Sequence, residues 1–146
     1  MALRRVKPVE AKRLIDEEGY VYLDVRSVPE FEQGHPTGAF NVPLMHMSPV
    51  GMQSNARFLE VVTRVFAKDA KIVVGCKSGG RSLRAAQTME QAGFTAVVDQ
   101  LAGFGGAADG FGRVSEPGWQ AAGLAVSTTA ETGRSWTELE QEKARG

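Results

Sequence analysis

Apolar residues recur along the first hundred positions with two alternating periodicities. Helical spacing, with an apolar stripe on one face, is found over 8–18, 58–66 and 81–92. Between these segments lie short, mostly β-branched runs of the kind that form buried strands, at 20–24, 39–42, 71–75 and 94–99. Ser27 and Glu30 have capping-box spacing for one further short helix. Because alternating strands and helices build a parallel sheet that is covered on both faces, the pattern predicts an α/β fold.

The periodicity changes after the last of these strands. Residues 103–118 are rich in glycine and lack a repeat, which indicates a surface loop, and 127–132 are polar. Trp136 and Leu139 belong to a segment that either docks as a terminal helix or stays loose. We therefore expect a single domain over 1–126, with a glycine-rich insertion at about 103–118, and a polar C-terminal tail over 127–146 with room for a short helix.

Composition narrows the possible partners and location. The 146 residues, 42% of them hydrophobic, suffice for one compact core. Seventeen basic and seventeen acidic residues cancel, so no net charge attracts nucleic acid or an anionic membrane, and no run approaches the roughly 18 apolar residues of a membrane span. With one cysteine and no apolar leader, the chain is expected to be cytoplasmic. An organellar protein whose transit peptide has been removed would look the same.

The lone cysteine, Cys76, directly follows the apolar strand that ends at Gly75. Chemistry in parallel sheets is found at the carboxyl ends of the strands. The next helix begins a few residues later, and its N-terminal N–H groups and dipole stabilise anions. Glycines at 79 and 80 allow the loop to curl around the sulfur, and Lys77 and Arg81 add positive charge. These surroundings favour a reactive thiolate over the main alternative, a buried structural cysteine.

Other anion-binding or metal-binding interpretations fit less well. The loop differs from a phosphate-binding P-loop in having Arg81 where that motif has lysine, and it is one residue shorter than the Cys-to-Arg loop of related phosphatases. His35 and His46 are not at metal-ligand spacing. The triplet Met45-His46-Met47 could bind copper(I), but methionines that fill gaps in a loop are the favoured explanation, so we expect no metal site.

The pattern Cys-x-x-Gly-x-Arg, from Cys76 to Arg81, resembles the active-site loop of rhodanese-type sulfurtransferases. Residues 22–26 with Glu30-Phe31 are similar to the first block of that family, and residues 34–43 are similar to its second. The three blocks occur in the family's order over about residues 5–125, and the chain is most similar to small single-domain members. The stretch between Gly106 and Trp119 is longer than is usual in the family, and it either shapes the mouth of the site or is a tolerated loop.

The resemblance implies a five-stranded parallel sheet flanked by helices on both faces, and a double displacement without a cofactor. Cys76 would take the outer sulfur of thiosulfate as a persulfide and pass it to cyanide, a thiol or a sulfur-accepting protein. Asp24 and Arg26 would be supporting residues, with Asp24 holding Arg81 or the loop backbone. The residues expected to bind the substrate are Lys77, Ser78, Gly79, Gly80, Arg81 and Ser82.

Two functions follow from this resemblance. The first is an active thiosulfate sulfurtransferase. The second is a persulfide carrier or sulfide-sensing adaptor that receives sulfur from a partner protein, with the glycine-rich insertion and the segment around Trp136 as docking surfaces.

Overall fold

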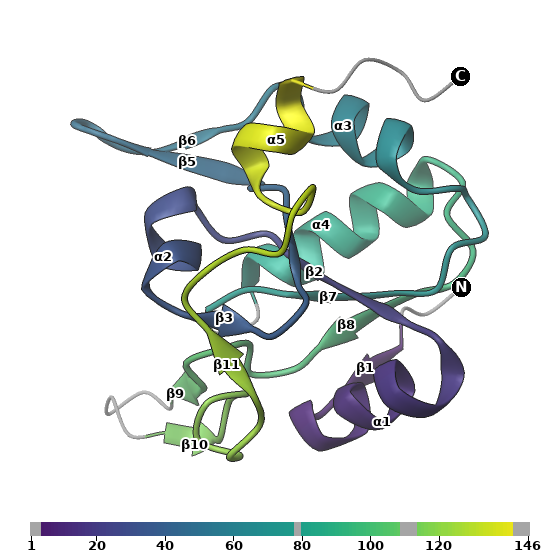
Figure 1. Ribbon diagram of the computed structural model, residues 1–146, viewed down its shortest axis with the longest axis vertical. Coiled ribbons are helices and arrows are strands. Elements are labelled where there is room, and N and C mark those ends of the chain that lie inside the picture. Colours follow the sequence, from purple (N-terminus) through teal and green to yellow (C-terminus); the bar gives the residue numbers. More distant parts are fainter. Residues whose placement is uncertain (1–3, 78–79, 109–113, 142–146) are drawn as a thin grey trace.

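Five parallel strands form the central sheet of the computed structural model, which describes residues 4–77, 80–108 and 114–141 (Figure 1). In spatial order the strands are β1 (Arg5–Val6), β8 (Val97–Gln100), β7 (Ile72–Gly75), β2 (Val21–Asp24) and β4 (Phe40–Asn41). All four neighbouring pairs are parallel. The expected α/β class and five-stranded parallel sheet are therefore confirmed, with the strand that leads to the cysteine at the centre.

Helices cover both faces of this sheet. α3 (Phe58–Val65) and α4 (Gly80–Gln91) lie on one face, and α1 (Pro8–Glu18) lies on the other (Figure 1). Successive side chains of a strand point to opposite faces, so β7 sends Val74 and Cys76 into the core under α3 and α4 and Val73 into the core under α1. The periodic segments of the sequence correspond to these elements within two or three residues.

A short helix, α2 (Val28–Gln33), links the sheet to the rim of the site. It begins with the expected capping box, in which the Glu30 carboxylate accepts hydrogen bonds from the Ser27 N–H and hydroxyl at 3.1 and 2.8 Å. After it, β3 (His35–Pro36) pairs antiparallel with β11 (Val126–Ser127). This pairing ties the end of the chain to the segment that follows α2.

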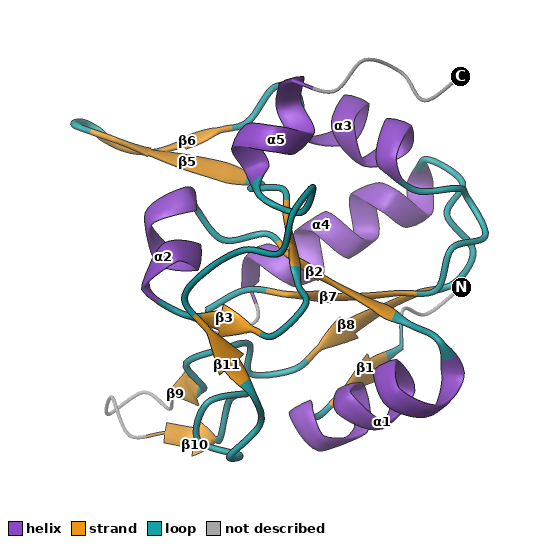
Figure 2. Cartoon of the chain, viewed as in Figure 1, coloured by secondary structure: helices purple, strands orange, loops and turns teal. Residues whose placement is uncertain are grey.

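Two small hairpins complete the structure. β5 (Met45–Ser48) and β6 (Gly51–Ser54) project from the body as an antiparallel arm, and β9 (Ala107–Ala108) pairs with β10 (Val114–Glu116) inside the glycine-rich segment (Figure 2). β5 and β6 do not show the buried apolar pattern that marks a strand of the sheet. In the part of the chain that the structure describes, no helix is long and apolar enough to cross a membrane.

The segment after residue 127 ends in α5 (Trp136–Gln141), which packs beside α3. Trp136 and Leu139 are buried in the same core as the residues of α3 and α4. Arg64 of α3 donates a hydrogen bond from Nη2 to the Leu139 carbonyl at 2.6 Å, and Arg57 donates one to the Glu140 carbonyl at 3.1 Å. Of the two outcomes expected for this segment, docking as a helix is the one observed.

Candidate active site

Cys76 lies at the carboxyl end of the central strand β7, where its side chain is only 2% exposed. α4 begins at Gly80, so a loop of a few residues separates the sulfur from the helix N-terminus. Two residues expected in the substrate-binding loop, Ser78 and Gly79, lie outside the described residues. The strand, cysteine and helix are therefore arranged as the sequence predicted, with the thiol at the end of a strand where reactive groups of parallel sheets are found.

The glycine-rich segment supports the main chain of the cysteine loop directly. The N–H of Phe104 donates to the Cys76 carbonyl at 2.6 Å, and the N–H of Gly105 donates to the Lys77 carbonyl at 2.8 Å. Gly103 has φ +55°, and a Cβ there would lie 2.2 Å from the Cys76 carbonyl oxygen. Only glycine fits such an approach, so residues 103–105 form a backbone brace rather than the surface loop expected from their composition.

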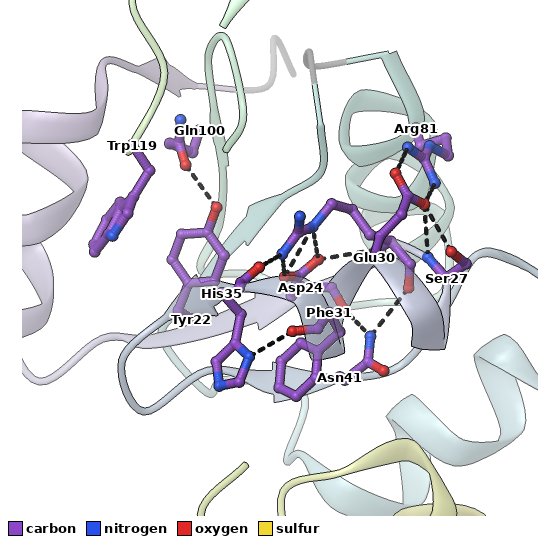
Figure 3. Close-up of polar contacts among 12 residues, drawn as sticks. Tyr22, Asp24, Ser27, Glu30, Phe31, His35, Asn41, Arg81, Gln100 and Trp119 are labelled. Atoms are coloured by element: carbon purple, nitrogen blue, oxygen red, sulfur yellow. Dashed lines mark hydrogen bonds and ion pairs between the residues drawn. The ribbon is translucent and has the colours of Figure 1, made fainter. Parts of the chain in front are cut away.

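A buried polar chain lies behind this brace (Figure 3). The Tyr22 hydroxyl donates to Gln100 Oε1 at 2.6 Å, and Gln100 Nε2 donates to the carbonyls of Leu101 and Gly103 at 2.7 and 2.8 Å. Burial raises the pKa of Tyr22 well above its usual range, so the phenol keeps its proton and remains the donor. This chain of hydrogen bonds holds Gly103 in place, and Gly103 in turn packs against the Cys76 carbonyl.

Arg81, in the first turn of α4, forms a bidentate ion pair with Glu30 of α2 (Figure 3). Its Nη1 and Nη2 lie 2.7 and 2.9 Å from Glu30 Oε1 and Oε2. Burial alone would raise the pKa of Glu30, but hydrogen bonds from Arg81 and Ser27 lower it to about 2. The pKa of Arg81 is raised chiefly by its hydrogen bonds to Glu30, although burial opposes this, and Cys76 and Asp24 add smaller effects in the same direction.

Asp24 and Arg26 form a second, buried ion pair. Arg26 Nη2 lies 2.7 Å from Asp24 Oδ2 and donates to the Gly34 carbonyl at 2.6 Å, and its guanidinium stacks 4.5 Å from the ring centre of Phe104. Burial disfavours the charge on Arg26, but Asp24 raises its pKa above the usual value. The Asp24 carboxylate accepts hydrogen bonds from the backbone N–H and the guanidinium of Arg26, and a role of Asp24 in holding Arg81 or the loop backbone stays a prediction.

One member of each ion pair, Arg26 or Glu30, lines a cavity of about 280 Å³ beside Lys77 of the cysteine loop, which we call the mouth. It is lined by Arg26, Glu30, Gln33, Gly34, Lys77, Phe104, Gly105 and Gln120. Lys77, Glu30 and Phe104 thus come from three separate segments of the chain. The charged side chains of this lining are Arg26, Lys77 and Glu30, and Lys77 directly follows Cys76 in the chain.

The other expected loop residues lie elsewhere. Gly80 is exposed at the start of α4. Ser82 is fully buried and acts on Asp99 at the end of β8: burial raises the pKa of Asp99, whereas hydrogen bonds from Ser82 and Arg5 lower it, and the net direction is upward. Lys77 therefore lies in the loop next to Cys76 and Arg81 in the first turn of α4, whereas Ser82 is turned toward Asp99 of the sheet.

The methionine–histidine triplet does not converge on one point. Residues of a strand alternate faces, so His46 points away from Met45 and Met47, and its ring packs 5.5 Å from that of Trp136. His35 is buried and stacks on Phe31 with ring centres 3.6 Å apart. Within the described residues, no group of three or more His, Cys, Asp or Glu side chains is arranged to hold a metal ion.

Several residues that organise the site were not among the sequence candidates: Glu30, Tyr22, Gln100 and Phe104. Glu30 had one signal, its capping-box spacing, but that signal predicts a role within α2 rather than a contact 51 positions away. A polar pair, Asp99-Gln100, at the end of the strand beside the catalytic one was an available hint. No feature of the neighbouring sequence identifies Phe104, because Phe104 contributes to the brace through its backbone N–H.

The structure thus combines a five-stranded parallel sheet with a cysteine at the end of its central strand and an arginine in the first turn of the following helix. Residues 7–105 match the family described as Rhodanese-like domain. The match covers more than half of the chain, so the chain belongs to this family. It ends at the brace, and the β9–β10 hairpin and α5 lie outside it.

Individual relatives agree with this assignment. The chain is 49% identical over 86 residues to "Thiosulfate sulfurtransferase 16, chloroplastic" of Arabidopsis thaliana, covering 59% of this chain and 72% of the relative. It is 44% identical over 97 residues to "Rhodanese-like domain-containing protein 15, chloroplastic" of the same plant, covering 66% of this chain but only 53% of the relative. The crystal structure of Rv0390 from M. tuberculosis aligns with a TM-score of 0.72 and 27% identity, over 88% of this chain and 100% of that one.

The expected cytoplasmic location is contradicted by these relatives, because both plant proteins are named as chloroplastic. The sequence argument rested on a single cysteine, balanced charge and the lack of an apolar leader. A reducing, aqueous plastid compartment imposes the same composition as the cytoplasm, so these features could not separate the two.

Proposed function

We propose that this protein is a sulfurtransferase that moves a sulfane sulfur from thiosulfate to cyanide or a thiol through a persulfide on Cys76. The observation that carries the proposal is the position of Cys76, which directly follows the central strand, with its carbonyl braced by Phe104 and with Arg81 in the first turn of the next helix. A thiolate held in this way is a fixed nucleophile next to a cation. The relative named as a thiosulfate sulfurtransferase supports the choice of donor.

The reaction needs one protein nucleophile. The Cys76 thiolate attacks the outer sulfur of thiosulfate, the sulfur–sulfur bond of the donor breaks, and sulfite leaves with the bonding electron pair. The resulting persulfide anion is stabilised by the positive charge of Arg81 and by Lys77 at the mouth. An acceptor thiolate or cyanide then attacks the terminal sulfur and releases the Cys76 thiolate, so no metal ion or organic cofactor enters the scheme.

The intact mass of the protein before and after incubation with thiosulfate tests this proposal. The wild type should gain one sulfur, about 32 Da, which cyanide removes again, as expected for a covalent intermediate. Cys76→Ser should gain nothing. An equal gain in both proteins, or none in the wild type, would overturn the proposal.

A role as a carrier that docks a partner through the segment around Trp136 is less well supported. Trp136 is buried in the core against α3 and is therefore not presented to a partner. Part of the other suggested docking surface, residues 109–113, lies outside the described residues. We retain active sulfur transfer as the proposed function.

A further inference from the structure

The ion pairs at the mouth leave little positive charge available to a donor. Arg26 is held by Asp24, and Arg81 by Glu30. Among the described residues that line the mouth, Lys77 is the cation without an ion-pair partner. A bound donor is therefore offered about one net positive charge at the mouth, although three basic side chains lie close to the site.

Glu30 controls how much of Arg81 a donor can use. Both terminal nitrogens of the guanidinium are bonded to the two carboxylate oxygens, and the two side chains are only 18% and 13% exposed. Bidentate pairs of this kind are strong, and the pKa of about 2 keeps Glu30 ionised at any working pH. A donor oxygen must displace the carboxylate to reach those nitrogens.

Glu30 also lines the cavity, so its charge acts on any donor that enters. The repulsion from the Glu30 carboxylate is twice as large for a donor with two charges as for a donor with one, so Glu30 reduces the advantage that the basic side chains give to a dianion. The aromatic ring of Phe104 and the backbone of Gly34 and Gly105 line the same cavity and offer contact surface for an uncharged group. Glu30 and Phe104 therefore both move the preference of this cavity toward a singly charged donor that bears an apolar group.

We propose that Glu30 shifts the preference of the donor site away from dianionic thiosulfate and toward singly charged sulfane-sulfur donors with an apolar group, the chemical class of organic thiosulfonates. This inference rests on the sulfur transfer proposed above. Thiosulfate remains a donor, but one that reacts against the charge of Glu30, and Phe104 provides the wall for the organic group.

The step with such a donor balances without an additional reactant. The Cys76 thiolate forms a bond to the outer sulfur of R–SO₂–S⁻, the bond between that sulfur and the sulfonyl sulfur breaks, and R–SO₂⁻ leaves with the electron pair. The thiolate and the thiosulfonate each bring one negative charge, and after the step one charge is on the persulfide and one on the sulfinate. With thiosulfate the site must hold three negative charges, because the sulfite that leaves carries two of them.

The test compares kcat/KM for benzenethiosulfonate and for thiosulfate in wild type and Glu30→Gln. In a double displacement, kcat/KM for the donor reports the first half-reaction alone, so the acceptor does not affect it. The two donors differ in intrinsic reactivity, and the informative quantity is therefore the change in their ratio between the two proteins. We expect Glu30→Gln to shift this ratio toward thiosulfate by roughly tenfold, as removal of one charge from a partly hydrated site would.

The exposed neighbour Glu32 provides the matched control, because Glu32→Gln makes the same charge change on the same helix away from the mouth. The ratio of kcat/KM for the two donors in Glu32→Gln should equal that of the wild type. Partial unfolding of Glu30→Gln lowers both rates alike and leaves the ratio unchanged. An unshifted ratio in Glu30→Gln, or an equal shift in Glu32→Gln, overturns the role of Glu30. If neither donor adds sulfur to wild-type Cys76, the proposed function fails and this inference fails with it.

Discussion

The hydroxyl of Tyr22 occupies the space in which a side chain at Gly75 would begin. A Cβ at Gly75 would lie 1.7 Å from Tyr22 Oη and 2.5 Å from Cζ. The two residues are on adjacent strands, with Tyr22 two positions before Asp24, the residue that pairs with Gly75. The glycine that precedes the cysteine therefore lets a tyrosine cross beneath the catalytic strand and reach Gln100.

We expect Gly75→Ala to push Tyr22 away from Gln100 and to lower the free energy of unfolding by about 1–3 kcal/mol, the usual cost of overfilling a core. Urea denaturation measures this. Tyr22→Phe is the companion variant, because it removes the buried hydrogen bond without adding an atom to β7 and should cost about 1–3 kcal/mol. Wild-type stability of Gly75→Ala would show that Tyr22 can move without loss.

Gly103→Ala should damage sulfur loading more than any other glycine substitution outside the cysteine loop. A Cβ would meet the Cys76 carbonyl at 2.2 Å and the Lys77 carbonyl oxygen at 2.7 Å, which displaces the loop from its brace. The rate of persulfide formation, followed by intact mass, is expected to fall by at least roughly tenfold, since small displacements of a nucleophile are costly.

Gly123→Ala is the control for Gly103→Ala. Gly123 also has a positive φ, +77°, but a Cβ there contacts nothing within 4 Å. It should lose about 1 kcal/mol of stability from the left-handed backbone and keep its loading rate. Equal loading by both variants would count against the brace.

Glu30 should make stability depend on pH in the acid range. Its pKa is lowered from 4.5 to about 2 in the folded protein, so its contribution is fully present above pH 4.5 and is lost as the pH falls toward 2. At neutral pH, Glu30→Gln should be less stable than the wild type by about 1–2 kcal/mol after allowance for solvent screening. Urea denaturation at several pH values should show this gap closing below pH 4.5, whereas Glu32→Gln should show no such trend.

Trp136→Ala should destabilise the whole domain. The indole is 7% exposed and packs in the core with residues of α3 and α4, so its removal should cost about 3–5 kcal/mol. Thr137→Ala, at the exposed neighbouring position, should change stability by no more than about 0.5 kcal/mol. Thermal unfolding distinguishes the two. If both variants had the same melting temperature as the wild type, α5 would not contribute to the stability of the domain.

The sequence predicted those helices and strands that bury one apolar face in a core. The strand 71–75, the helix after it and the cysteine between them were predictable, because a buried parallel strand requires a continuous apolar run and a helix requires a stripe. The capping box of α2 was predictable for a similar reason, since both partners lie within one turn. The hairpin of β5 and β6 was not, because its residues carry no alternation that a core would impose.

The sequence also did not predict which polar residues, far apart along the chain, pair with each other. Asp24 was expected to hold Arg81 or the loop backbone, whereas the ion pair of Arg81 is with Glu30, and that pairing depends on how α2 is set against the sheet, which no local pattern encodes. The brace was missed because it is made of backbone groups: glycine at 103 is required by a close approach of two chain segments, and composition alone could not distinguish that from a flexible loop.

The burial of α5 has a consequence for synthesis of the protein. Domains commonly fold while they emerge from the ribosome, the N-terminal part first. Here the core over α3 and α4 lacks Trp136 and Leu139 until that helix leaves the exit tunnel. The nascent chain must therefore carry its cysteine for some time in an unfinished domain, with the surface that α5 will cover still open to chaperones and to oxidants.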